Sequence, residues 1–172
     1  MRWSCNLAWL LSYVLAVPLY AAQLSSTDFE LSFPAGWKLS SHPAGFFVAS
    51  PSDDKRTLPF LAVQPCRAVG LQDCAKIAGS YLETGISRDA IKGWPAPASF
   101  VALPRSDGVR EFSSSSSGPY NGANAFALFR LFVFPDDYLL VFYMSSAESQ
   151  AHAAAELEAI LSTNLRLNLG TR

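Results

Sequence analysis

A long apolar region of the chain, NAFALFRLFVFPDDYLLVFYMSS, is divided in two by a Pro-Asp-Asp sequence at residues 135–137. Each half is about ten residues long, too short to cross a membrane as a helix. Aromatic and branched residues on both sides of such a turn are typical of a β-hairpin. We therefore predict strands over 125–134 and 138–145. The first is apolar on both faces apart from Arg130, which predicts a central strand covered on both sides.

Further strands are predicted where apolar and polar residues alternate or where short apolar runs are bounded by turn residues. Phe29, Leu31 and Phe33 alternate with polar residues before a Pro-Ala-Gly turn. Asp107-Gly108 is another turn dipeptide, and it separates two of the remaining runs. These runs are GFFVASP (45–51), the strand at 58–64, SFVALP (99–104) and GVREFSS (108–114).

In two segments the apolar residues have the spacing of a helix. Between Gly70 and Leu82, apolar or small residues recur at offsets of three, four and seven. Near the C-terminus, Ser145 and Glu148 fit a capping box that starts a helix ending at about Ser162. Its predicted inner face comprises Ala151, Ala154, Leu157, Ile160 and Leu161. The sequence thus predicts an α+β domain, an antiparallel sheet of about six to seven strands flanked by two main helices.

The N-terminus has the pattern of a secretory signal peptide. Arg2 precedes an apolar stretch over residues 3–19, and Ala21 and Ala22 are small residues suited to cleavage. We expect residues 1–22 to be removed, leaving a single domain at 23–172 in the periplasm. Cys5 lies at the start of this stretch, before its apolar core, and is not at a lipoprotein cleavage position, so no stable membrane anchor is expected after cleavage.

Net charge argues against two classes of partner. The chain has 13 basic and 14 acidic residues, and loss of Arg2 leaves a net charge of −2. Nucleic-acid binding depends on neutralising phosphates, so a nearly neutral domain is poorly suited to it. The chain also lacks a polybasic tract for an anionic membrane.

Cys66 and Cys74 are the two cysteines of the predicted mature protein. In an exported chain the expected state is a disulfide, here joining the end of a strand to the start of a helix. The spacing is not that of a redox C-x-x-C motif, and no nearby histidine completes a zinc site. We expect this disulfide to stabilise the fold and to have no catalytic role.

The segment FSSSSSGPYNG (112–122) contains the five consecutive serines. Three interpretations remain open: a solvated loop, a loop that contacts a protein partner, or a nucleophile paired with His42. No G-x-S-x-G elbow supports the last. A polar surface with one aromatic residue suits protein contact. The candidate contact residues are Ser113, Ser114, Ser115, Ser116, Ser117, Tyr120 and Asn121.

Other polar and aromatic residues are expected to have structural roles. The acidic pairs at 53–54 and 136–137 fit turns, and their spacing is not that of a calcium loop. Arg130 is expected to form an ion pair, or to lie at a sheet edge with its head in water. Trp37 and Trp94 are expected to pack in the core. No metal or cofactor is predicted.

The opening FELSFPAGWK, the mid-chain helix, the late hairpin and the terminal AAAELEAILSTNLRL together resemble the PsbP-like superfamily, over most of residues 28–167. This group includes the photosystem II protein PsbP and the bacterial envelope lipoprotein DcrB. The resemblance implies an α/β/α sandwich that acts as a binding or assembly module, without catalytic residues to transfer. Unlike DcrB, this sequence has no lipobox cysteine.

From these features we expect an exported, non-enzymatic protein-binding module. Its most specific form is an immunity protein that neutralises a periplasmic toxin, for instance a type VI secretion effector. The alternatives are an envelope accessory factor for a membrane complex or transport, and a serine hydrolase.

Overall fold

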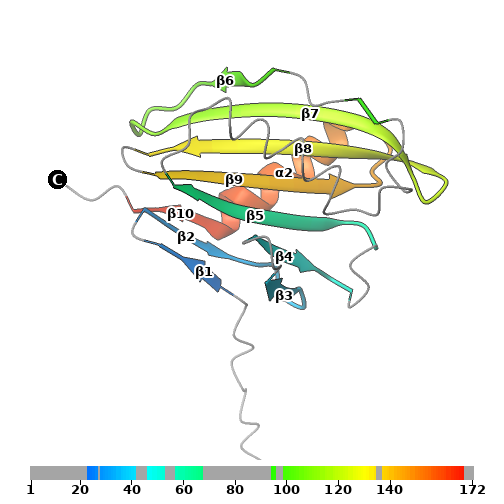
Figure 1. Ribbon diagram of the computed structural model, residues 1–172, viewed down its shortest axis with the longest axis horizontal. Coiled ribbons are helices and arrows are strands. Elements are labelled where there is room, and N and C mark those ends of the chain that lie inside the picture. Colours follow the sequence, from blue (N-terminus) through cyan, green and yellow to red (C-terminus); the bar gives the residue numbers. More distant parts are fainter. Residues whose placement is uncertain are drawn as a thin grey trace, which may run out of the picture.

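The computed structural model describes residues 23–26, 28–41, 46–52, 57–67, 94–95, 99–134 and 137–168, without the side chains of 65–67 and 137. A seven-stranded antiparallel sheet has the order β3-β4-β5-β9-β8-β7-β6, and a small sheet has the order β1-β2-β10. The helix α2 crosses one face of the large sheet (Figure 1). The strands are β1 Gln23–Ser25, β2 Phe29–Ser32, β3 Lys38–Ser41, β4 Phe47–Ser50, β5 Phe60–Arg67, β6 Val101–Leu103, β7 Arg110–Tyr120, β8 Ala123–Val133, β9 Asp137–Ser145 and β10 Leu165–Leu167, and α2 is Gln150–Asn164.

The predicted α+β class is confirmed. The small sheet and α2 share one apolar core with the large sheet, because β2 buries alternate residues against it. Phe29 and Leu31 lie in this core beside Leu157 of α2 and Val141 of β9. The short strands β1, β3 and β10 were not predicted from the sequence.

The predicted hairpin is confirmed as β8 and β9, which pair as far as Val133 and Tyr138. β8 also has the predicted central place, between β7 and β9. Successive side chains of a strand point to opposite faces of its sheet. Accordingly Leu128 belongs to the core beneath α2, whereas Phe129 belongs to a second core on the other face. Phe129 stacks there on Phe142, with ring centroids 5.0 Å apart.

The serine segment is not a loop, and this prediction was wrong. Residues 112–120 continue β7, which pairs with β8 from Arg110↔Val133 to Tyr120↔Ala123. The turn consists only of Asn121 and Gly122, with φ of 49° and 81°. Asn-Gly is the residue pair that a two-residue type I′ hairpin turn favours. The long apolar β8 offers a complete ladder of hydrogen bonds, which outweighs the weak strand preference of serine.

The predicted start of the last helix was also wrong. The N-cap is Ser149, whose hydroxyl accepts a hydrogen bond from the backbone N–H of His152 at 3.2 Å. Ser145 is instead the last residue of β9, because it still pairs with Phe126 of β8. The predicted inner face is confirmed for Ala154, Leu157, Ile160 and Leu161, which belong to the core or pack against it, but not for Ala151, which is exposed. The helix buries Ala153, Leu157 and Leu161.

Several predictions fall outside the described residues and stay predictions. They include the signal peptide at 1–22, the helix at 70–82, and the position of His42. The disulfide belongs with them, because neither Cys74 nor the side chain of Cys66 is described. Among the helices that the structure describes, none combines the length and apolar character needed to span a membrane.

Candidate functional site

The two faces of β7 present their serines to different surroundings. Cross-strand partners lie on the same face of a sheet, and Ser113 pairs with Arg130 while Ser115 pairs with Leu128. These odd-numbered residues face α2. Ser114 and Ser116 pair with residues of the opposite core and face away from α2.

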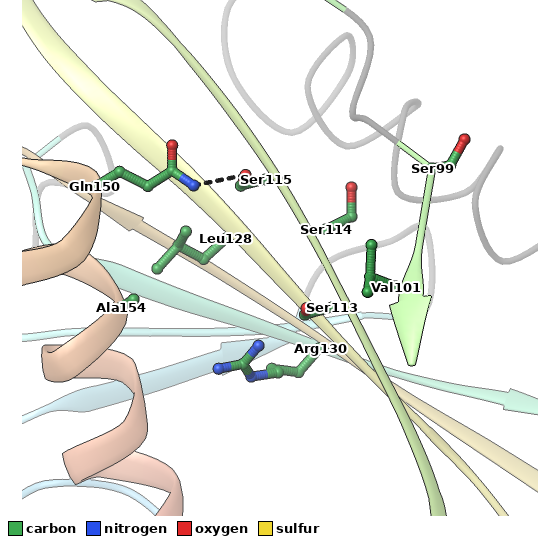
Figure 2. Close-up of a pocket in the computed structure, with 9 residues that line it drawn as sticks. All are labelled: Ser99, Val101, Ser113, Ser114, Ser115, Leu128, Arg130, Gln150 and Ala154. Atoms are coloured by element: carbon green, nitrogen blue, oxygen red, sulfur yellow. Dashed lines mark hydrogen bonds between the residues drawn. The ribbon is translucent and has the colours of Figure 1, made fainter. Parts of the chain in front are cut away.

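A pocket of about 260 Å³ opens between β7 and the first turns of α2 (Figure 2). It lies beside Val101, the first residue of β6, since the pairing of β6 with β7 goes no further along β7 than the Val101↔Ser113 pair. Gln150 at the start of α2 donates its amide N–H to the hydroxyl oxygen of Ser115 at 2.9 Å. Arg130 lines the same pocket, together with the apolar side chains of Leu128 and Ala154.

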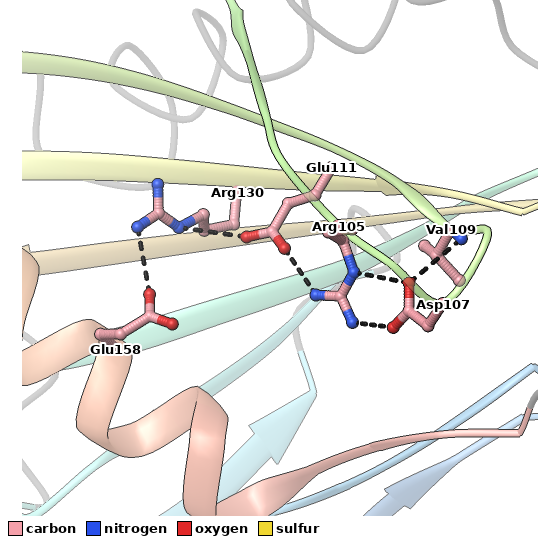
Figure 3. A network of polar contacts seen from close by, with 6 residues as sticks. All are labelled: Arg105, Asp107, Val109, Glu111, Arg130 and Glu158. Atoms are coloured by element: carbon pink, nitrogen blue, oxygen red, sulfur yellow. Dashed lines mark hydrogen bonds and ion pairs between the residues drawn. The ribbon is translucent and has the colours of Figure 1, made fainter.

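Arg130 belongs to a network of alternating charges that runs from the pocket to the start of β7 (Figure 3). Its Nε lies 3.5 Å from Oε1 of Glu111, and its Nη2 donates to Oε2 of Glu158 at 3.2 Å. Glu111 is only 8% exposed, and it also accepts a 2.6 Å hydrogen bond from Nη1 of Arg105. A buried carboxylate needs such counter-charges. The ion pair predicted for Arg130 is confirmed, and an edge position is excluded because β8 is central.

The far end of this network fixes the turn before β7. Arg105 makes two contacts with the carboxylate of Asp107, and Oδ1 of Asp107 accepts the backbone N–H of Val109 at 3.2 Å. The hydrogen bond from Arg105 lowers the pKa of Asp107, and the same hydrogen bond raises the pKa of Arg105. The Arg105 guanidinium also lies 5.7 Å from the ring centroid of Phe132.

A second polar network attaches α2 to β9. Oε2 of Glu156 accepts hydrogen bonds from the hydroxyls of Tyr143, at 3.0 Å, and Ser145, at 2.7 Å. Burial raises the pKa of the Tyr143 hydroxyl, and the hydrogen bond to Glu156 raises it further. Unlike Arg130, neither Tyr143 nor Ser145 lines the pocket.

The structure separates the predicted contact residues into groups. Ser113, Ser114 and Ser115 all line the pocket, although Ser114 lies on the other face of β7 from Ser113 and Ser115. The hydroxyl of Ser116, on the same face as Ser114, donates to the carbonyl of Pro95 at 2.9 Å. Ser117 is exposed on β7. Of the remaining two, Tyr120 is only 4% exposed and packs in the core, and Asn121 is exposed in the hairpin turn.

Trp94 packs beside the end of this strand, in agreement with its predicted structural role. Its indole Nε1 donates to the carbonyl of Pro119 at 2.7 Å. Its ring lies so close to Gly118 that an added Cβ would approach ring atoms to 2.8 Å. Trp37 likewise packs against the core beneath α2.

The serine nucleophile predicted as an alternative is not tested, because His42 lies outside the described residues. His152 is exposed on α2, with Nε2 4.0 Å from Oε1 of Glu156. Within the described ranges, no three or more His, Cys, Asp and Glu side chains gather as a group that could hold a metal.

The ion-pair network is the part of the site that sequence analysis missed. Asn121-Gly122 fixes the register of the β7–β8 hairpin, and counting back from it pairs Ser113 with Arg130. Glu111 then lies on the same face as Arg130 and diagonal to it, which is the position for a cross-strand ion pair. Because the turn at Asn121-Gly122 was not predicted, the ion pair between Glu111 and Arg130 could not be predicted either.

Comparison with solved structures identifies the fold. Cyanobacterial PsbP (CyanoP) from Synechocystis sp. PCC 6803 superposes with a TM-score of 0.57 at 16% identity, covering 91% of this chain and 98% of that one. The fold is PsbP-like. This PsbP-like fold agrees with the resemblance drawn from the sequence.

Two further structures share the PsbP-like arrangement. LpqN, involved in cell envelope biogenesis of Mycobacterium tuberculosis, has a TM-score of 0.50 at 11% identity, covering 86% of this chain and 84% of that one. A protein from Bacteroides thetaiotaomicron VPI-5482 has a TM-score of 0.51 at 11% identity over 86% of this chain. This chain spans 48% of the length of the Bacteroides protein. No protein-family model and no curated protein sequence matches the chain.

Proposed function

We propose that this protein is an exported accessory protein of the cell envelope that acts by binding a protein partner and not by catalysis. The observation that carries the proposal is the position of the serines. They lie on a strand paired along its whole length with β8, beside an open pocket. A polar surface held in one conformation loses little entropy when it binds.

The fold comparisons support an envelope role, since LpqN has the same fold and is involved in cell envelope biogenesis. Export rests on the predicted signal peptide at residues 1–22. The narrower form of the proposal is toxin neutralisation in the periplasm. In this form, the face of β7 that carries Ser113, Ser115 and Ser117 would cover the active site of the toxin. Both forms use the same face of β7 and differ in the partner.

Affinity capture of the tagged protein from native periplasm and from solubilised membranes, read by mass spectrometry, tests the proposal. We expect one stoichiometric partner. It should be lost when Ser117→Arg adds bulk and charge at an exposed position on this face of β7. Thr163→Arg is the matched control, because Thr163 is exposed near the other end of α2. A soluble toxin as partner would favour neutralisation, and a membrane complex would favour the accessory role. A partner retained equally by both variants would contradict binding through β7.

A further inference from the structure

The charges around Arg130 are unequal in their exposure. Arg105 and Arg130 balance Asp107 and Glu111, and Glu158 is the fifth charge of the network. The side chain of Glu158 is 64% exposed, whereas that of Glu111 is 9% exposed. An exposed ion pair contributes little to stability because water competes with it. Glu158 is therefore the one carboxylate of the network that another carboxylate can replace easily.

Arg130 also has hydrogen-bonding capacity to spare. Its Nε is buried but makes no hydrogen bond of good geometry, although Glu111 lies 3.5 Å away. Its guanidinium is thus not locked in a two-point pair with either glutamate. The planar guanidinium has five N–H donors in a fork that matches a carboxylate, so a bidentate pair would be stronger than the present contacts.

The pocket supplies the remaining contacts for such a group. Figure 2 shows Arg130 extending toward α2 on the side of the sheet that carries Ser113 and Leu128. The hydroxyl of Ser115 accepts from Gln150, which leaves its own O–H as a donor for a ligand. Gln150 is the first residue of α2, and the amino end of a helix favours a negative charge.

We infer that the pocket between β7 and α2 binds a carboxylate group that replaces Glu158 on Arg130. The group forms a two-point pair with the guanidinium and accepts hydrogen bonds from the serine hydroxyls. The aliphatic part of the ligand lies against Leu128 and Ala154. Two sources present this chemistry, the C-terminus of a peptide chain and a small organic acid. The inference needs no protein partner, so it stands or fails separately from the proposed function.

Titration of the purified, ¹⁵N-labelled protein followed by NMR tests this inference. The probes are N-acetyl-alanyl-alanine with a free carboxylate, the same dipeptide as its C-terminal amide, and sodium propionate. We expect the free dipeptide to shift the signals of Ser113, Ser115 and the Arg130 Nε–H, and the amide to leave them unchanged. Equal binding of the amide would overturn the inference. A dipeptide that binds at least ten times more tightly than propionate identifies a chain terminus, and similar affinities identify a small acid.

Glu158→Gln gives the sharpest test, because the inference predicts a gain. The variant removes the competing carboxylate, so the free dipeptide should bind about fivefold more tightly, on the scale of a lost exposed ion pair. An unchanged or weaker affinity would contradict replacement of Glu158. Arg130→Gln should abolish binding, but it also removes a counter-charge from buried Glu111 and can destabilise the fold.

Ser113→Val therefore provides a second loss-of-binding variant that leaves every ion pair in place. Valine suits a strand, removes the hydroxyl and narrows the pocket. Ser117→Val is the matched control, since it makes the same change on the same face of β7 outside the pocket. We expect at least a tenfold loss of dipeptide affinity for Ser113→Val and no change for Ser117→Val. Equal affinities in the two variants would place the binding elsewhere.

Discussion

β7 and β8 are neighbouring strands of eleven residues each, paired from one end to the other, yet their sequences have almost nothing in common. β8 is apolar on both faces, and Arg130 is its one charged residue. β7 carries five serines, a glycine and a proline. Serine, glycine and proline are depleted or neutral in strands, so the composition of β7 alone favours a loop.

The difference follows from what lies on the far side of each strand. Among the described strands, β8 has β9 beyond it, whereas β7 has only the three-residue β6, which pairs with residues 111–113. Most of β7 is therefore paired with a described strand on one side only and needs fewer apolar side chains. An apolar strand such as β8 can therefore keep a polar neighbour such as β7 in the sheet. The polar side chains of β7 can then form a surface for binding.

The largest expected effect separates the two members of one cross-strand pair, Phe129 of β8 and Ser114 of β7. Phe129 is fully buried and stacks on Phe142, so Phe129→Ala should lower the free energy of unfolding by about 3–5 kcal/mol. Ser114 is buried and has a polar partner, so Ser114→Ala should lower the free energy of unfolding by about 1 kcal/mol. Urea unfolding measures both. Similar losses would show that β7 contributes to the core as much as β8.

The difference between β7 and β8 explains which elements could be predicted from the sequence and which could not. The hairpin of β8 and β9 was predicted almost to the residue, because both arms are apolar and the sequence Pro-Asp-Asp lies between the predicted strands. The alternation of Phe29 and Leu31 likewise revealed β2, which buries one face. In these segments the local pattern and the tertiary environment agree, so periodicity alone identifies the element.

The serine segment was misjudged because its structure depends on a partner strand that composition does not reveal. The helix start was misjudged for a related reason, since β9 extends through Ser145 by pairing with Phe126 and leaves Ser149 to cap the helix. The residues of the candidate site differ in the same way in how well they could be predicted. Ser113 and Ser115 were chosen from the sequence, but Glu111 and Glu158 reach Arg130 only through register and helix placement.

A smaller effect is expected at Gly118, where β7 depends on having no side chain. A Cβ at this position would come within 2.8 Å of the Trp94 ring, so Gly118→Ala should destabilise the protein by about 1–3 kcal/mol and shift the tryptophan emission. Gly122→Ala is the control, because its Cβ meets nothing within 4 Å and only the positive φ of 81° opposes it. Its emission should stay unchanged. A stable Gly118→Ala with native emission would contradict the close packing of Trp94 on β7.

The turn before β7 predicts a pH-dependent effect below about 1 kcal/mol, the usual range for an exposed ion pair. Arg105 lowers the pKa of Asp107 in the folded protein. A carboxyl whose pKa falls on folding stabilises the fold above its unfolded pKa of about 3.9 and loses this contribution as the pH drops further. Asp107→Asn should therefore be less stable than the wild type at pH 7, and the gap should close at acidic pH. A gap that is constant with pH would show that the ionised carboxylate is not responsible.

The smallest effects are expected at Ser115 and Ser117. They test most directly whether β7 depends on its own hydroxyl groups to stay in the sheet. The hydroxyl of Ser115 accepts one exposed hydrogen bond from Gln150, so Ser115→Ala should lower the free energy of unfolding by about 0.5 kcal/mol. For Ser117→Ala, at an exposed position, we expect a change within about 0.5 kcal/mol. Urea unfolding measures both variants, and a loss above about 1.5 kcal/mol in either would mean that the hydroxyls hold the fold together. Small losses would mean that the hydroxyls of Ser115 and Ser117 are not needed to keep β7 in place, and that these serines are available to contact a ligand or a partner.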